Sequence, residues 1–295
     1  MEITASLVKE LREKTGAGMM DCKKALQECE GDIARSIDWL REKGIAKAAK
    51  KAGRIAAEGL TRVLVDGNRA ALVEINSETD FVAKNDSFIK LLDDTTKAIL
   101  THNPKDLAAA EMVSLGTQTV GEAIIAAIAT IGEKISLRRF VVVEKAAEDC
   151  FGSYMHMGGK ISALAIIKNS QDGEVAKDMA MQVASMSPQF ISQAHMDSDF
   201  IEHEKAIQME ILKNDESLAG KPEKVLEGII RGRLSKSLQD ISLIDQVYFK
   251  DQDKKVGQFL KEHNTEVVDF VRYAVGDGLE KREENFAEEV LKTSF

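Results

Sequence analysis

The sequence predicts an α+β protein in which three short helices precede two similar halves, each a three-stranded antiparallel sheet packed with helices. Apolar residues at helical spacing within residues 1–54 predict a compact three-helix domain. The same order of elements, a hairpin, then helices, then a third strand, occurs in residues 59–143 and again in 151–250. Sheets with helices grouped on one face are typical of α+β folds.

Three helices are expected at the start of the chain, because apolar side chains recur on one side of residues 3–14, 20–29 and 33–43. A bundle of about 45 residues lies near the lower limit for independent folding and suits a binding module. Residues 44–57 are rich in Ala and Lys, and are expected to form a linker with helical tendency and a solvated cationic face.

The first half is expected to open with a hairpin turned at Asp66-Gly67, a pair that strongly favours such turns between β-rich runs. Its elements are strands at 59–65 and 69–75, helices near 87–100, 105–112 and 121–130, and a third strand at 137–143.

The second half is expected to turn its hairpin at Gly158-Gly159. Its elements are strands at 150–157 and 161–167, a helix at 173–186 and a third strand at 245–249. Residues 196–238 interrupt it with a helical hairpin, which either packs on its own protein or contacts a second copy. Two more helices are expected at 254–263 and 278–292.

Residues 76–86 are strongly polar yet carry a large aromatic side chain, Phe81. A turn that only reverses the chain uses Gly, Pro, Asn or Asp, and has no need of Phe at its tip. Two interpretations stay open from these residues alone. Phe81 either folds back onto the core, as most Phe side chains do, or is displayed to a partner, because aromatic residues often anchor interfaces.

The 295 residues are 44% hydrophobic, and no apolar run approaches the roughly 20 residues that span a bilayer. No signal peptide is expected at the acidic residues 1–4. Three cysteines without metal-ligand spacing indicate a reducing, cytoplasmic location. Residues 1–54 hold 12 Lys and Arg against 9 Asp and Glu, and the remainder holds 28 against 40, so the net charges are +3 and −12. The acidic remainder argues against direct nucleic-acid binding.

The sequence contains no phosphate-loop, H-E-x-x-H or G-x-S-x-G pattern, so no known reaction centre is recognisable. Glu78, Asp80 and Asp86 could act as catalytic or metal-binding carboxylates, although a polar, solvated loop is the favoured interpretation. We therefore expect no catalytic residue, no metal and no cofactor. A chain of this length without such a centre favours a protein that binds other proteins.

Four segments resemble the bacterial elongation factor Ts family: TGAGMMDCKKAL at 15–26, TDFVAKN at 79–85, KEHN at 261–264 and VGDG at 275–278. The resemblance implies a ubiquitin-associated-like three-helix domain with its basic linker at 1–54, core subdomains at 55–145 and 146–265, a helical hairpin inserted at about 196–238, and a C-terminal module at 266–295.

The family is the guanine-nucleotide exchange factor for the GTPase elongation factor Tu, and it carries out no covalent step of its own. The resemblance implies that the chain binds the GDP-bound GTPase and promotes GDP release, after which GTP binds. The tip inserted near the Mg²⁺ and phosphate site would be Thr79, Asp80, Phe81 and Val82. Further partner contacts would be Leu11, Arg12, Met19, Met20, Ile131, Gly132 and His156.

Two other functions remain as alternatives. A metal-dependent hydrolase that uses Glu78, Asp80 and Asp86 would turn over substrate without a partner. An adaptor for ubiquitin-like proteins or nascent chains would bind mainly through residues 1–54 and would have no exchange activity. Pairing of two copies through the helical hairpin is a further possibility for any of these functions.

Overall fold

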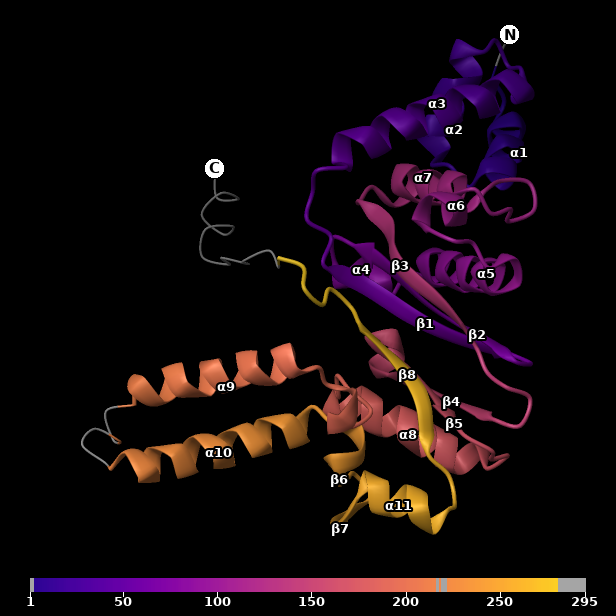
Figure 1. Ribbon diagram of the computed structural model, residues 1–295. Helices are drawn as coiled ribbons and strands as arrows, with labels where there is room; N and C mark the ends of the chain where they lie inside the picture. The colour runs from indigo at the N-terminus through magenta and orange to yellow at the C-terminus, as the bar shows by residue number, and fades with distance from the viewer. Residues whose placement is uncertain (1–2, 216–217, 219–221, 281–295) are drawn as a thin grey trace. The chain divides into compact units, whose positions relative to one another are not determined.

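The computed structural model describes residues 3–215, 218 and 222–280 (Figure 1). These residues fall into two compact units, which are described separately. The first unit comprises residues 3–143, 157–161 and 273–280. The second comprises residues 144–156, 162–215, 218 and 222–272. No helix in the described ranges is both long and apolar enough to cross a membrane.

Three helices open the first unit, as the apolar spacing predicts: α1 (Ala5–Thr15), α2 (Met19–Glu28) and α3 (Ile33–Lys51). The hydroxyl of Thr4 accepts a hydrogen bond from Leu7 N at 3.3 Å, and the carboxylate of Asp32 accepts one from Arg35 N at 2.9 Å. These caps satisfy backbone donors where α1 and α3 begin. The core of the bundle consists of Val8, Leu11, Cys22, Ala25 and Leu26.

The expected end of the third helix near residue 43 is wrong, because α3 continues to Lys51 through the first part of the predicted linker. Ala and Lys favour helix, and the added turns lie against α7 (Val120–Ile131). Gly44 is buried at this contact, where a Cβ would lie 3.4 Å from Ile125 Cγ2 and 3.6 Å from Ala129 Cβ. The helix is therefore held in place by packing as well as by its composition.

Replacing Gly44 by alanine should stabilise the first unit by about 0.5–1 kcal/mol, because alanine loses less backbone entropy in a helix and its methyl group fits this contact. Urea unfolding followed through Trp39, the single tryptophan, measures the change. Gly44→Val is the matched control, since its extra carbons would press on Ile125 and should destabilise the unit. A loss of stability in Gly44→Ala would contradict this packing.

The first sheet has the strand order β1 (Glu58–Asp66), β2 (Arg69–Ser77), β3 (Ile135–Glu144). β1 and β2 are antiparallel and pair from Glu58 with Ser77 to Asp66 with Arg69, which confirms the predicted hairpin. The strands and helices share one hydrophobic core. The remaining helices are α4 (Asp80–Ala83), α5 (Asp86–His102) and α6 (Leu107–Glu111), with α5, α6 and α7 on the same side of the sheet (Figure 1).

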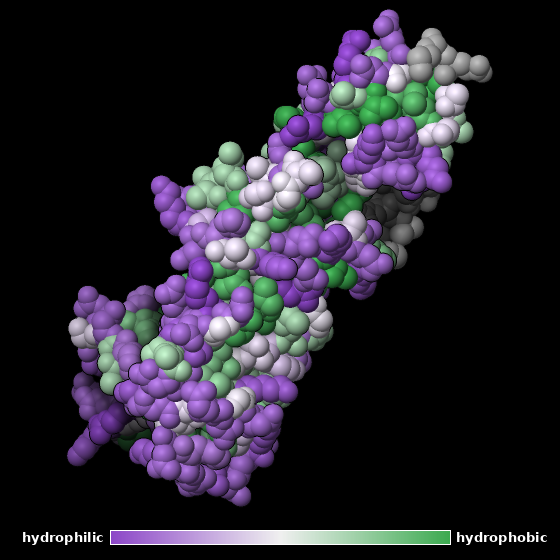
Figure 2. Space-filling model, turned by 90° about the vertical axis from the view of Figure 1, so that its right-hand side faces the viewer, coloured by the Kyte–Doolittle hydropathy of each residue, from purple (hydrophilic) through white to green (hydrophobic). Residues whose placement is uncertain are grey.

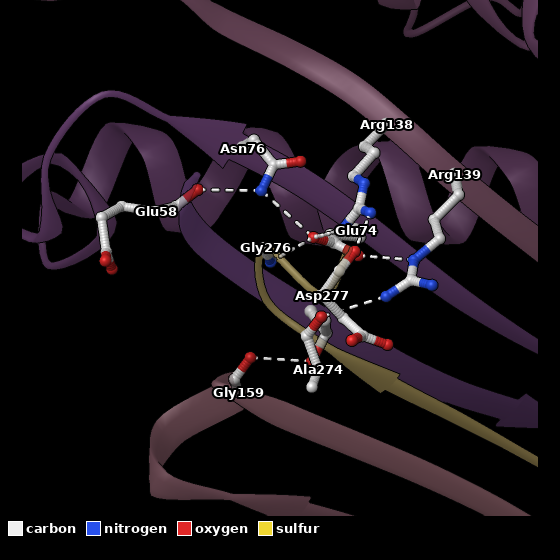
Figure 3. A network of polar contacts seen from close by, with 10 residues as sticks. Glu58, Glu74, Asn76, Arg138, Arg139, Gly159, Ala274, Gly276 and Asp277 are labelled. Atoms are coloured by element: carbon white, nitrogen blue, oxygen red, sulfur yellow. Dashed lines mark hydrogen bonds and ion pairs between the residues drawn. The ribbon is translucent and has the colours of Figure 1, made fainter. Parts of the chain in front are cut away.

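The other face of β2 carries a carboxylate, Glu74, whose side chain has no exposed surface. Figure 3 shows the polar groups around it. Its Oε1 accepts from Arg138 Nη1 at 2.9 Å, Gly276 N at 2.9 Å and Asn76 Nδ2 at 3.1 Å. Its Oε2 accepts from Arg139 Nε at 2.6 Å. Glu74 therefore helps to fasten the chain near residue 276 to the first sheet, together with Arg138 and Arg139, which donate to Asp277 O and Ala274 O.

The second unit contains another three-stranded sheet, in the order β4 (Cys150–His156), β5 (Ile161–Ile167), β8 (Val267–Ala274). Helix α8 (Gly173–Met186) packs against β4. A Cβ at Gly152 would lie 1.8 Å from Ala176 O, so only glycine permits so close a contact between strand and helix. The predicted α+β fold, with a three-stranded sheet in each half, is confirmed.

The predicted third strand of this sheet at 245–249 is wrong, because β6 (Val247–Tyr248) pairs instead with β7 (Asp251–Lys255) in a small sheet of two strands. The reason lies in side chains of α8. The Gln182 amide donates to Val247 O at 3.0 Å and accepts from Phe249 N at 2.9 Å, so it takes the place of a neighbouring strand. β8 supplies the third strand, from residues that the sequence assigned to the C-terminal module.

The helical hairpin is present as α9 (Ser198–Lys213) and α10 (Glu223–Asp240), which run side by side (Figure 1). Pairing of two copies through it stays a prediction. Helix α11 (Val256–Glu262) follows β7, and short 3₁₀ turns occur at Met157–Gly159, Gln193–His195 and Leu243–Asp245. The helix predicted at 278–292 lies outside the described residues from position 281 onward.

Candidate functional site

The polar stretch after β2 forms a one-turn helix, α4, with Thr79 as its N-cap residue. Val82 and Ala83 are 7% and 3% exposed and join the core beneath the first sheet's helices. Lys84 N donates to Phe81 O at 3.2 Å and Asn85 N donates to Val82 O at 3.0 Å, so the turn is closed by backbone hydrogen bonds. A helix of four residues is unstable alone, and the two buried side chains anchor it.

Phe81 points away from this anchor and is 79% exposed, which makes the core interpretation of this residue wrong. Among the exposed large hydrophobic residues of the described ranges it is the one aromatic, and the most exposed of them all. The face in Figure 2 shows hydrophobic residues in groups separated by hydrophilic ones. The ring is exposed to water on a backbone that buried neighbours hold in place. A partner that covered the ring would therefore bury apolar surface.

Asp80 lies beside Phe81 and is bound by Lys84, whose Nζ donates to Asp80 Oδ2 at 2.7 Å. This hydrogen bond holds the pKa of Asp80 below its usual value, so the side chain is a carboxylate at neutral pH. The same Lys84 ammonium lies 5.7 Å from the centre of the Phe81 ring. The tip therefore presents an apolar ring next to a carboxylate whose charge is locally balanced.

The tip is joined to the turn that follows α7 by two carboxylates. Glu133 accepts from Thr79 N at 2.9 Å and from Thr79 Oγ1 at 2.7 Å. Glu78 accepts from Lys134 N at 2.6 Å and from Arg54 Nη1 at 3.2 Å. Residues far apart in the sequence thus form one continuous surface around α4.

Two of the expected partner contacts lie where α7 meets this turn: Ile131 is the last residue of the helix and Gly132 follows it. Gly132 ends α7 with φ 88°, a conformation that favours glycine, and its N–H donates to Ile128 O at 3.0 Å. Ile131 is half-buried against the core, whereas Gly132 is exposed. The structure therefore brings Ile131 and Gly132 together with the tip, as neighbours through Glu133.

The expected contacts in the N-terminal bundle divide by exposure. Met19 and Met20, at the start of α2, are 59% and 74% exposed, and Arg12 on α1 is exposed as well. Leu11 is fully buried in the bundle core, so it supports this surface from below and does not form part of it.

His156, the remaining expected contact, belongs to the second unit. It is exposed at the end of β4, and its Nδ1 lies 3.2 Å from the hydroxyl of Tyr154. Strand register places it at the surface, which the sequence alone left undecided. Met155 beside it is 40% exposed.

Three residues that bind or neighbour the tip were not expected from the sequence to do so: Glu133, Lys84 and Glu78. Glu78 was expected to be solvated. The side chain of Glu78 is only 14% exposed because backbone and guanidinium donors hold it. A signal for Lys84 was its spacing of four from Asp80, which favours an ion pair on a helix. Nothing local indicated Glu133, whose partner lies 54 residues earlier.

The carboxylates of the hydrolase alternative do not form a metal site in the structure. Glu78 and Asp80 are each engaged by the donors given above. Within residues 3–215, 218 and 222–280, no three His, Cys, Asp or Glu side chains are grouped so that they could hold a metal ion.

A family model described as Elongation factor TS matches residues 78–277 of this chain. The match covers about two thirds of the 295 residues, begins at the tip and ends beside the glycine that binds Glu74. The chain belongs to the elongation factor Ts family of translation elongation factors.

Proposed function

We propose that this chain binds elongation factor Tu in its GDP-bound form and accelerates GDP release by placing Phe81 and Asp80 against the Mg²⁺ and phosphate site of the GTPase. The observation that carries the proposal is the 79% exposure of Phe81 on a turn whose other residues are anchored. Such a ring has the position expected of an interface anchor. Membership of the family makes elongation factor Tu the partner that we propose.

Displacement of GDP needs no covalent step. GTPases hold the nucleotide through backbone N–H groups around its phosphates and through Mg²⁺. An inserted ring and carboxylate would disturb this grip, so the GTPase would bind GDP and the exchange factor at each other's expense. By linkage the two weaken one another by the same factor. GTP binding then completes the exchange and releases the factor.

The exposed residues outside the tip support a partner surface with several contacts. In this proposal residues 1–54 form a domain that holds the nucleotide-binding domain of the GTPase, through Arg12, Met19 and Met20. Gly132 extends the contact beside the tip, and His156 meets another domain of the GTPase. Leu11 and Val82 act by holding these surfaces in shape, because both are buried.

The test is the release of fluorescently labelled GDP from elongation factor Tu in the presence of excess unlabelled nucleotide. We expect the chain to raise the release rate, and to lower the affinity for GDP by about 5- to 150-fold, the range typical of coupling between two sites. Binding without any change in release would contradict the proposal and favour the adaptor alternative. An adaptor would also keep its full binding activity when the tip is altered.

A further inference from the structure

Glu133 is a carboxylate outside the tip that uses both of its oxygens on one residue of the tip. Its Oε2 accepts from Thr79 N at 2.9 Å, and its Oε1 accepts from Thr79 Oγ1 at 2.7 Å. Hydrogen bonds to a charged acceptor are stronger than neutral ones, and a two-point grip also fixes orientation. Thr79 cannot rotate about its side chain or its backbone without losing one of these bonds.

Thr79 is the N-cap residue of α4, the position at which the direction of this short helix is set. The Thr79 side chain accepts no capping bond from within the helix, so it does not hold α4 in the usual way. Its hydroxyl points to Glu133 and not back toward the helix. The residues that follow immediately are Asp80 and Phe81. The entry angle of the tip therefore depends on a residue from another element.

The turn that carries Glu133 is held in place by hydrogen bonds at both of its neighbours in the sequence. Gly132 O accepts from Lys51 Nζ at 2.5 Å, and Lys134 Nζ donates to Arg54 O at 2.9 Å. Glu78, the residue before Thr79, accepts a hydrogen bond from Lys134 N at 2.6 Å. Carboxylate-to-backbone bonds thus cross in both directions between the tip and the turn. Lys51 at the end of α3 and Lys134 of the turn each donate to a backbone oxygen of the other segment.

We propose that Glu133 is a positioning residue of the exchange tip, which orients Asp80 and Phe81 through its two-point hold on Thr79. The inference rests on the proposed exchange function. Glu133 need not touch the partner. Its effect is to fix the tip before binding, so that the GTPase does not have to order a loose loop at the moment of contact.

The experiment compares Glu133→Ala with the wild-type chain in the GDP-release assay and in hydrogen–deuterium exchange of the peptide that covers residues 78–85. We expect a release rate lower by about 10- to 100-fold, since a misplacement of roughly 1 Å can cost on the order of 100-fold. We also expect faster amide exchange at the tip. Glu133→Gln, which keeps its size and one acceptor oxygen, should lie between the two.

A double-mutant cycle separates positioning from a general structural effect. If Glu133 acts through the tip, Glu133→Ala should have little further effect on release when Asp80→Ala and Phe81→Ala are already present. Glu148→Ala is the matched control, because it removes the same charge from an exposed side chain of the second unit, and it should release GDP like the wild type. Thr79→Val, which keeps the N–H but loses the hydroxyl, should reproduce part of the defect.

Additive losses in the cycle, or unchanged amide exchange at the tip in Glu133→Ala, would overturn the positioning role. A different result bears on the proposed function itself. If Phe81→Ala released GDP like the wild type, the exchange proposal would fail, and the role of Glu133 in exchange with it. The amide-exchange measurement would still report whether Glu133 orders the tip, so the two failures are distinguishable.

Discussion

Under the proposed exchange function, Phe81→Ala should make GDP release from elongation factor Tu slower by about 10- to 100-fold than with the wild-type chain. Full burial of a Phe side chain is worth about 1.5–3 kcal/mol, and each 1.4 kcal/mol corresponds to roughly tenfold. The ring is 79% exposed in the free chain, so nearly all of that burial is still available to a complex. Stopped-flow release of labelled GDP from elongation factor Tu measures the effect directly.

The same substitution should leave the melting temperature almost unchanged, because exposed surface substitutions usually fall within about 0.5 kcal/mol. Met112→Ala is the matched control, since Met112 is 74% exposed in the same unit but lies at the end of α6. Equal slowing by both variants would show that general surface apolarity, and not the ring at this tip, drives release. Phe81→Leu should recover part of the rate.

The elements that the sequence predicts well are those whose predictive signal lies within their own residues. The helix predicted at 173–186 coincides with α8 because its apolar residues repeat at helical spacing over almost four turns. The first hairpin follows from its turn, where Gly67 has φ 57° between two paired strands. In both cases the signal is contained in residues close in sequence, although α8 also packs on β4.

The elements that could not be predicted depend on distant partners. The sequence predicts residues 245–249 as the third strand of the second sheet, whereas residues 267–274 pair with β5 and Gln182 of α8 binds the backbone at Val247. Phe81 is exposed because Val82 and Ala83, on the other side of the same helical turn, pack in the core. The link from Glu133 to Thr79 spans 54 residues, and no local pattern encodes it.

Glu74→Ala should lower the free energy of unfolding of the first unit by about 3 kcal/mol, because removal of one partner from a buried ion pair typically costs about 3–5 kcal/mol. The lower end applies, since the side chains of Arg138 and Arg139 remain 19% and 30% exposed and can reach water. The Gly276 N–H would also lose its acceptor. Urea unfolding followed by Trp39 fluorescence measures the loss at neutral pH.

The stabilisation by Glu74 should depend on pH in one direction. Burial alone raises the pKa of Glu74, but the Gly276 N–H, Arg138 and Arg139 outweigh it and hold the pKa below its usual value. A carboxylate with a lowered pKa stabilises the folded state above its unfolded pKa of about 4.3, and that stability is lost as pH falls through the folded pKa. The wild type should therefore exceed Glu74→Gln in stability at pH 7, and the difference should shrink steadily below about pH 4.

Glu74→Gln is the sharper comparison, because it keeps the shape and an acceptor for Gly276 while it removes the charge. A difference in stability that stayed constant from neutral to acid pH would mean that the charge of Glu74 contributes nothing to the stability of the folded state.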